Sequence, residues 1–364
     1  MSVNVMNASS FILLLMLILL ILHKLEFAGV KGIFEDALSL KNTITIRGAA
    51  AVCVILTHTG VIPFYKHGFL FVGIFFFFSG YGLMLSLKKK PGYLKGFFRN
   101  RLPSVIVPYY TMNIFYIIAL FGLGFTPTID MVFRSFFLPM MKRSLFITSA
   151  WYVIAIVLFY VFFGIFFRYF KFFKAFLLTA LGIAIYCMLC RHFGRSISWY
   201  GTTSLFLLGI LFAQYYSKIY AIIRKKHFIL SILMLLLFIN GVIVDYQARG
   251  LLKFFTHQIS CAFFVLFIIT LLYKFHIKSS LLAFWGKVSY ELYIAHHLVI
   301  LFLNNSTINP PWKNSVYCLH WDSRIGVALS TVAIATLIAF IMNRINQKLL
   351  NSLKKSSESV TVKS

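Results

Sequence analysis

Acidic side chains are scarce in this sequence. Among its 364 residues there are only 8 Asp and Glu, against 35 Lys and Arg, so the formal net charge is +27. Such a charge is common in proteins that bind nucleic acids. Here, however, the cations lie in short stretches between apolar runs and form no basic domain. We therefore expect no nucleic-acid partner, and we interpret the cations as loop residues that fix the topology of a membrane protein.

Cysteines are also few, and they follow no pattern. There are five of them, and no pair has the spacing of a metal site with accompanying histidines: Cys53, Cys187, Cys190, Cys261 and Cys318. A disulfide framework and a zinc site are therefore not expected, and we predict no metal cofactor. Internal repeats and long low-complexity tracts are missing as well.

Apolar residues, in contrast, make up 60% of the chain. Runs of near-spanning length recur from end to end, which a soluble core could not absorb. We predict an all-α, polytopic membrane protein with about ten or eleven transmembrane helices, at residues 9–26, 44–62, 68–87, 104–124, 148–167, 175–190, 199–216, 228–244, 255–273, 282–303 and 325–343. The run at 9–26 has no basic start and no clear cleavage site, so we expect a retained anchor; whether it spans fully stays open.

The distribution of cations predicts the orientation. With Arg47 on the cytoplasmic side, alternating segments place 24 Lys and Arg inside and 10 outside, as the positive-inside rule requires. The C-terminus is then cytoplasmic. We divide the chain into an additional N-terminal segment with a basic linker (1–42), a membrane domain (43–344) and a polar cytoplasmic tail (345–364).

The stretch from Arg47 to His58 is apolar between its two ends. On a helix the two residues are close to three turns apart, on nearly the same face and about 16 Å apart along the axis. His58 would then lie near the middle of the hydrocarbon layer, which is roughly 30 Å thick. An intramembrane histidine is either functional or bonded to a neighbouring helix as part of the packing. Spacing alone favours neither interpretation.

A second stretch, 289–297, contains Glu291, the only acidic residue deep within an expected helix. Glu291 is four residues after Lys287 and could simply pair with it. His296 reaches a depth similar to that of the first histidine, and Tyr293 shares its helix face. Of His296 and its neighbour His297, at most one can point into a common cavity, and we favour His296.

Small and aromatic residues mark two further positions. The sequence Ser79-Gly80-Tyr81-Gly82 interrupts a phenylalanine run, and such small residues allow helices to approach closely. Trp151 and Tyr152 open the fifth expected segment, where interfacial aromatic residues are common in any case. Packing is a sufficient explanation for both patterns.

The loop from Lys88 to Arg101 is more basic than orientation requires. Such a cluster can be a topology signal, a contact with anionic membrane lipids or a phosphate site. Arg99 and Arg101 precede a proline-restricted helix start, where guanidinium groups can bind phosphates.

Together these patterns resemble the integral-membrane acyltransferase type 3 family, the bacterial O-acetylases of surface glycans. The stretch Arg47 to His58 is similar to the family's first motif. Further similarities, in the same order, lie at Phe77-Phe78-Ser79-Gly80-Tyr81, Phe98-Arg99-Asn100-Arg101 through Pro108-Tyr109, Ala150-Trp151-Tyr152 and Ser289 through His296. One departure is Ser104, which stands where members often have a second arginine, so phosphate binding would fall to Arg99, Lys95 or Arg101.

The resemblance implies a reaction and the residues that carry it out. It implies transfer of an acyl group, usually acetyl, from cytoplasmic acetyl-CoA to a hydroxyl of a surface or lipid-linked glycan, in the bacterial plasma membrane. Its catalytic residues would be His58, Glu291 and His296. Its CoA-binding residues would be Arg47, Arg99, Arg101 and Lys95, and its substrate pocket would contain Ser79, Tyr81, Trp151, Tyr152 and Tyr293. Oligomeric state is not indicated.

A transporter or flippase for a glycan precursor is the competing interpretation. Intramembrane histidines and a basic cytoplasmic loop also suit a proton-coupled carrier. Carriers commonly contain internal repeats with paired broken helices, and the lack of a repeat here favours the enzyme.

Overall fold

The structure, a computed structural model, describes residues 25–29, 32–61, 67–137, 146–304 and 313–361. The expected segment 9–26 lies outside the described residues apart from its last two. The all-α prediction is confirmed, and nine of the described helical stretches are long and apolar enough to cross a membrane. The helix α13 is apolar but shorter, at Ser289–Leu303.

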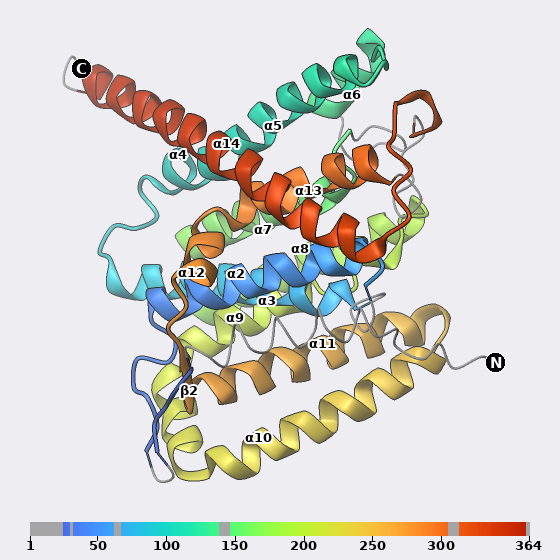
Figure 1. The fold of residues 1–364 in the computed structure, drawn as a ribbon. Coiled ribbons are helices and arrows are strands. Elements are labelled where there is room, and N and C mark those ends of the chain that lie inside the picture. Colours follow the sequence, from blue (N-terminus) through green and yellow to red (C-terminus); the bar gives the residue numbers. More distant parts are fainter. Residues whose placement is uncertain (1–24, 30–31, 62–66, 138–145, 305–312, 362–364) are drawn as a thin grey trace.

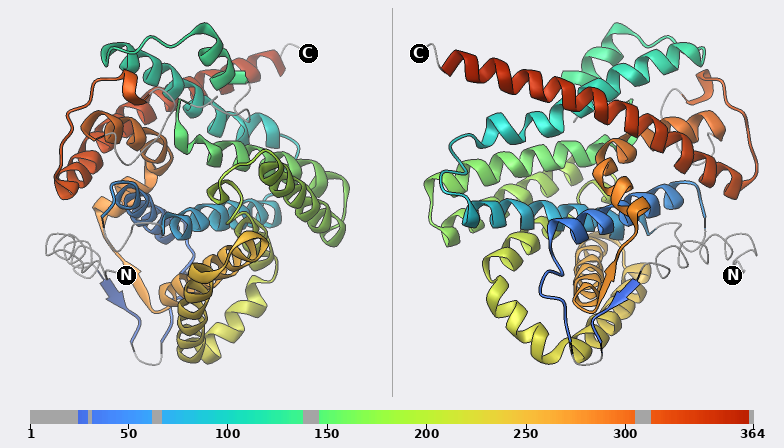
Figure 2. Two further views of the ribbon diagram at one scale, coloured as in Figure 1. Left: turned by 90° about the vertical axis from the view of Figure 1, so that its right-hand side faces the viewer. Right: turned by 60° about the vertical axis from the view of Figure 1, so that its left-hand side comes forward.

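The helices follow one another along the chain, several of them with short connections. Their bounds are α2 Leu40–His58, α3 Gly68–Lys89, α4 Phe97–Arg101, α5 Pro103–Gly122, α6 Ile129–Phe137, α7 Trp151–Tyr169, α8 Phe172–His192, α9 Ser204–Gln214, α10 Tyr216–Gln247, α11 Gly250–Leu272, α12 Ser280–Lys287, α13 Ser289–Leu303 and α14 Arg324–Thr361. Figures 1 and 2 show most of them running side by side, with α10 and α11 on one flank and α5 and α14 on the other.

Two expected segments differ from the structure. The segment 282–303 is not one helix, because the backbone leaves helical geometry at Val288 and separates α12 from α13. The expected loop between 216 and 228 is helical, so α10 is continuous apart from a kink at Lys226. Polar residues can form a helix because the backbone N–H and C=O groups pair within the helix. The prediction that these polar residues form a loop, which depended on composition alone, was therefore wrong.

Local sequence explains several helix ends. The Ser39 side chain accepts a hydrogen bond from the amide of Asn42 at the start of α2, and Ser279 does the same for Leu282 in α12. Pro103 occupies the first turn of α5, where its missing N–H costs nothing. Gly250 has a φ of +58°, a conformation that glycine adopts without strain, and it permits the tight reversal from α10 to α11.

Glycines also allow a close helix crossing between α3 and α9. A side chain at Gly80 of α3 would collide with the carbonyl oxygen of Phe206 in α9, and one at Gly209 of α9 would collide with that of Phe77. The two helices therefore pack backbone against backbone. This confirms the expectation that the small residues near Ser79 allow two helices to approach closely. The close packing also fixes the position of the neighbouring aromatic residues along α3.

A two-stranded antiparallel sheet joins distant parts of the chain. Strand β1 (Leu25–Phe27) pairs with β2 (Phe275–Ile277), with Glu26 opposite His276. Glu26 forms an ion pair with Lys278 (2.8 Å), and this pair lowers the pKa of the Glu26 carboxyl below its usual value. The sheet ties the segment before α2 to the turn between α11 and α12, at the Arg47 end of the bundle.

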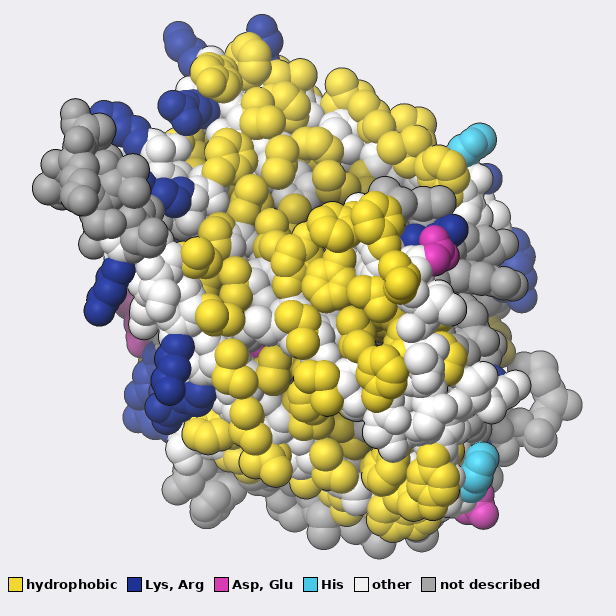
Figure 3. Space-filling model, turned by 90° about the horizontal axis from the view of Figure 1, so that it is seen from above, with side chains coloured by type: hydrophobic (Ala, Val, Ile, Leu, Met, Phe, Trp, Pro, Cys, Tyr) yellow, Lys and Arg dark blue, Asp and Glu magenta, His cyan; other side chains and the backbone are white. Residues whose placement is uncertain are grey.

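Apolar side chains cover the outside of the bundle. Figure 3 shows hydrophobic residues spread across the face on which α5 and α14 lie, while most visible Lys and Arg side chains lie along its left edge. The same edge holds the C-terminal end of α14 in Figure 1. An apolar band bordered by cations is the surface expected of a protein that spans a membrane.

Candidate functional site

Helix α2 connects two cavities that lie at its opposite ends. The first, here called the arginine cavity, has a volume of about 440 Å³ and is lined by Arg47 and Arg101. It also contains four of the residues predicted for a substrate pocket: Ser79, Tyr81, Tyr152 and Tyr293. Arg47 is half-buried, and its Nε is buried with no hydrogen-bond partner among the described residues. A buried donor without a partner is costly, so this guanidinium is ready to bind an acceptor-rich ligand.

The other two predicted phosphate-binding residues lie elsewhere. Lys95 lines a separate cavity of about 240 Å³ together with Lys90 and Arg168. Arg99 is exposed on α4 and is not among the residues that line the arginine cavity. Arg101 is held in place by its Nε, which donates a hydrogen bond to the hydroxyl of Tyr93 (2.9 Å). The structure therefore places Arg101, and not Arg99 or Lys95, in the lining of the same cavity as Arg47.

The second cavity, here called the histidine cavity, has a volume of about 610 Å³. It is lined by His58 at the end of α2, His297 of α13, and Trp151 at the start of α7. Its polar wall includes Asp245 and His257 from α10 and α11. The two ends of the Arg47–His58 stretch thus open into different cavities, as expected from their separation of about 16 Å along a helix.

Three histidine rings, those of His58, His296 and His297, lie close together beside this cavity. The ring centroid of His58 lies 5.3 Å from that of His296 and 4.5 Å from that of His297. Both ring nitrogens of His296 are buried without a hydrogen-bond partner among the described residues. His297 is the one that lines the cavity, and its Nδ1 is hydrogen-bonded to the hydroxyl of Thr148. The preference for His296 as the cavity residue therefore differs from the structure, although both rings contact His58.

The same three side chains are close enough to share a metal ion. One nitrogen from each of them lies within 4.8 Å of the others, and imidazole is a common ligand of zinc. The alternative is a cluster of neutral imidazoles that exchange protons with a substrate. The sequence analysis predicted no metal, because no pair of cysteines has the spacing of a metal site with accompanying histidines.

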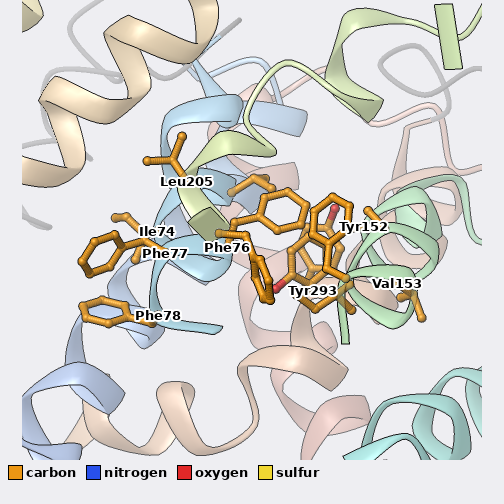
Figure 4. Packing of buried hydrophobic residues seen from close by; sticks show 14 of the residues in the cluster. Ile74, Phe76, Phe77, Phe78, Tyr152, Val153, Leu205 and Tyr293 are labelled. Atoms are coloured by element: carbon orange, nitrogen blue, oxygen red, sulfur yellow. The ribbon is translucent and has the colours of Figure 1, made fainter. Parts of the chain in front are cut away.

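Two tyrosines separate the cavities. Tyr293 lines both of them, and its ring centroid lies 5.5 Å from that of Tyr152. Phe76 packs against Tyr152 at 4.8 Å, and Figure 4 shows the three rings grouped beside α3. Ser79 and Tyr152 line the same cavity. Trp151, the residue before Tyr152, faces the histidine cavity, so one helix start contributes to both sides of this partition.

Glu291 is buried but lines neither cavity. Its Oε1 accepts hydrogen bonds from the side-chain amides of Asn343 and Asn346 in α14, each at 3.1 Å. Lys287, the alternative partner considered from the sequence, is exposed at the break between α12 and α13. Glu291 therefore connects α13, which carries His296 and His297, to α14.

Sequence reasoning missed one polar cluster. Asp245 is only 6% exposed and forms an ion pair with Lys253 (2.8 Å) and a hydrogen bond with His257 Nδ1 (2.9 Å). Glu291 is thus not the only acidic residue buried in a helix. Asp245 follows directly after the expected segment 228–244, so it was placed in a loop. The polar run Thr256-His257-Gln258 inside an expected span was the signal that could have revealed it.

A comparison with family models identifies the family of the chain. The model of a family described as an acyltransferase domain matches residues 44–344, which include all the motifs identified above. Searches of curated proteins and of solved structures gave no match. The match covers most of the chain, and the chain therefore belongs to the acyltransferase type 3 family of membrane proteins.

Proposed function

We propose that this membrane acyltransferase moves an acetyl group from cytoplasmic acetyl-CoA to a hydroxyl of a surface or lipid-linked glycan, in the plasma membrane of a bacterium. The observation that supports this most directly is the pair of cavities at the two ends of α2. One has guanidinium groups, the other has imidazoles, and Tyr293, whose ring packs beside that of Tyr152, lines both. A reaction between a phosphate-rich donor and a hydroxyl acceptor on opposite sides of a membrane requires this division.

The donor would bind in the arginine cavity. Arg47 and Arg101 would contact the phosphates of CoA, since guanidinium groups bind phosphate oxygens through charge-assisted hydrogen bonds. The thin pantetheine arm would extend between Ser79 and Tyr81 on α3 and Tyr152 on α7, which line the same cavity. Its thioester would then reach the tyrosine partition. With this orientation, the C-terminal end of α14 lies on the cytoplasmic side.

The acceptor hydroxyl would meet His58 in the histidine cavity. As a general base, His58 would take the hydroxyl proton while the oxygen attacks the thioester carbonyl and the CoA thiolate leaves. As a transient carrier, it would first take the acetyl group and then pass it to the hydroxyl. His296 and His297 contact the His58 ring and can share its proton in either course. Glu291 would hold α13, and with it these two imidazoles, in position.

The test uses the full-length chain in liposomes with labelled acetyl-CoA, together with surface glycans of a deletion strain and its parent compared by mass. We expect the deletion to remove an acetyl increment from one glycan and His58→Ala to remove it equally, with normal accumulation of the variant. His192→Ala is the matched control, because His192 is exposed at the end of α8. Unchanged acetylation in His58→Ala would refute the mechanism, and export of a precursor without any acetyl transfer would indicate a transporter or flippase.

A further inference from the structure

The Asp245–His257 pair has features that helix packing does not require. Asp245 lies in the last turn of α10 and His257 in the second turn of α11, and the reversal at Gly250 brings them together. Two other contacts already tie the helices at this point. Lys253 donates to Asp245 Oδ2 at 2.8 Å and also to the backbone carbonyl of Asp245, and the Thr256 hydroxyl lies 2.9 Å from Oδ1. The imidazole of His257 is an additional polar group, and it lines the histidine cavity.

The ring of His257 is held in a single orientation. Its Nδ1 lies 2.9 Å from Asp245 Oδ1, and a carboxylate there makes Nδ1 a donor, so that in the neutral imidazole the lone pair is on Nε2. One face of the ring stacks on Phe69, with centroids 3.7 Å apart. Gly201 lies so close to the ring that an added Cβ would be 2.9 Å from His257 Cδ2. Since no described residue hydrogen-bonds Nε2, the cavity contains a fixed and unused hydrogen-bond acceptor.

The surroundings indicate what this acceptor would bind. Lys253 neutralises Asp245, so the wall has no net charge that would select an ionic ligand. Trp151, Trp199 and Tyr246 line the same cavity and offer flat apolar faces with polar edges. Aromatic faces next to an oriented hydrogen-bond acceptor suit an uncharged ring that carries several hydroxyl groups.

We propose that His257, oriented by Asp245, binds the acceptor sugar by accepting a hydrogen bond from one of its hydroxyl groups through Nε2. The cavity then takes an uncharged pyranose ring, and this contact determines which neighbouring hydroxyl faces His58. The proposal rests on the proposed function for its place in the reaction. The predicted binding of the sugar does not depend on acetyl transfer.

Two measurements on the purified full-length chain test the proposal, with methyl glycosides of glucose, galactose and N-acetylglucosamine as probes. The first is saturable quenching of tryptophan fluorescence by the probe without acetyl-CoA, since two tryptophans line the cavity. The second is the KM for the probe with labelled acetyl-CoA, alongside acetyl-CoA hydrolysis without acceptor. We expect His257→Phe, which keeps a ring against Phe69, to weaken probe binding on the order of tenfold, the loss of one hydrogen bond.

Three comparisons make the outcome decisive. His257→Gln, whose amide oxygen can replace Nε2 as an acceptor, is expected to regain part of the binding. His227→Phe, on α10 away from the cavity lining, is expected to bind the probe like the unmodified chain. The unfolding temperature of His257→Phe and the hydrolysis rate of His227→Phe are expected to stay near those of the unmodified chain, which a general structural defect would change.

Equal probe binding by His257→Phe and the unmodified chain would overturn the proposal, as would the lack of binding of any probe to the unmodified chain. Probe binding that depends on His257 without any acetyl transfer would refute the proposed function and leave the sugar site intact.

Discussion

The ring of Tyr293 lies 5.5 Å from that of Tyr152, and Tyr293 lines both the arginine cavity and the histidine cavity. These rings therefore form the narrow partition between the two sides of the bundle. Truncating Tyr293 to Ala removes a large buried ring, which creates a void on the order of a phenyl group that joins the two cavities.

For Tyr293→Ala we expect acetyl-CoA to be hydrolysed faster without acceptor, because water gains access to the thioester from the histidine cavity. Tyr293→Phe keeps the ring and is expected to hydrolyse acetyl-CoA at the rate of the unmodified chain. The hydrolysis rates of both variants are measured from the release of free CoA, which a thiol reagent detects. Equal hydrolysis by the Ala and Phe variants would show that the ring is not a barrier.

Arg47 and Arg99 allow a matched test of donor binding. Arg47 lines the arginine cavity, whereas Arg99 is exposed on α4. Arg47→Ala is expected to raise the KM for acetyl-CoA by roughly tenfold to a hundredfold, the loss of one or two charge-assisted hydrogen bonds, with little change in the KM for the acceptor. Arg99→Ala is expected to change neither constant by much. A larger effect from Arg99, or equal effects of Arg47→Ala on both substrates, would contradict the placement of the phosphates.

Variants of Glu291 test whether this side chain only holds α13 in position or also takes part in the reaction. Glu291→Leu leaves the amides of Asn343 and Asn346 without their acceptor, which should cost about 1–3 kcal/mol of stability for each buried group. Glu291→Gln keeps an oxygen that can accept both bonds, so we expect near-normal unfolding in detergent and most of the acetyl transfer. If Glu291→Gln unfolds normally but is inactive, the negative charge itself takes part in the reaction.

The glycines of α3 differ in what a methyl group would meet. At Gly80 it would collide with the Phe206 carbonyl of α9, while at Gly82 no atom lies within 4 Å. Gly80→Ala is expected to destabilise the protein by about 1–3 kcal/mol through overpacking, and Gly82→Ala to leave the unfolding temperature nearly unchanged. Thermal unfolding of the purified variants checks this. Similar temperatures for both would mean that α3 and α9 can move apart without cost.

The sequence predicted the helical class, most spans and the Arg47–His58 relationship, because all three depend on hydrophobic length and helical period. It could not show that Arg101, rather than Arg99, lines the same cavity as Arg47. That choice depends on the path of the chain through α4 and on the contact with Tyr93. Asp245 and His257 were missed for a similar reason. They are 12 residues apart, in two different helices, and only the sharp turn at Gly250 makes them neighbours.

The tyrosine partition also has an electrical consequence. When an acetyl group leaves CoA on one side and joins an oxygen on the other, it carries one formal positive charge across, and the thiolate left behind needs a proton. If that proton came from the solvent on the thiolate side, each turnover would move one charge through the membrane field, at about 2.3 kcal/mol per 100 mV. If the acceptor hydroxyl supplies the proton instead, the proton crosses in the direction opposite to the acetyl group, and no net charge moves through the membrane. The histidines beside the partition offer this second route, so we expect the rate of acetyl transfer to be independent of membrane potential.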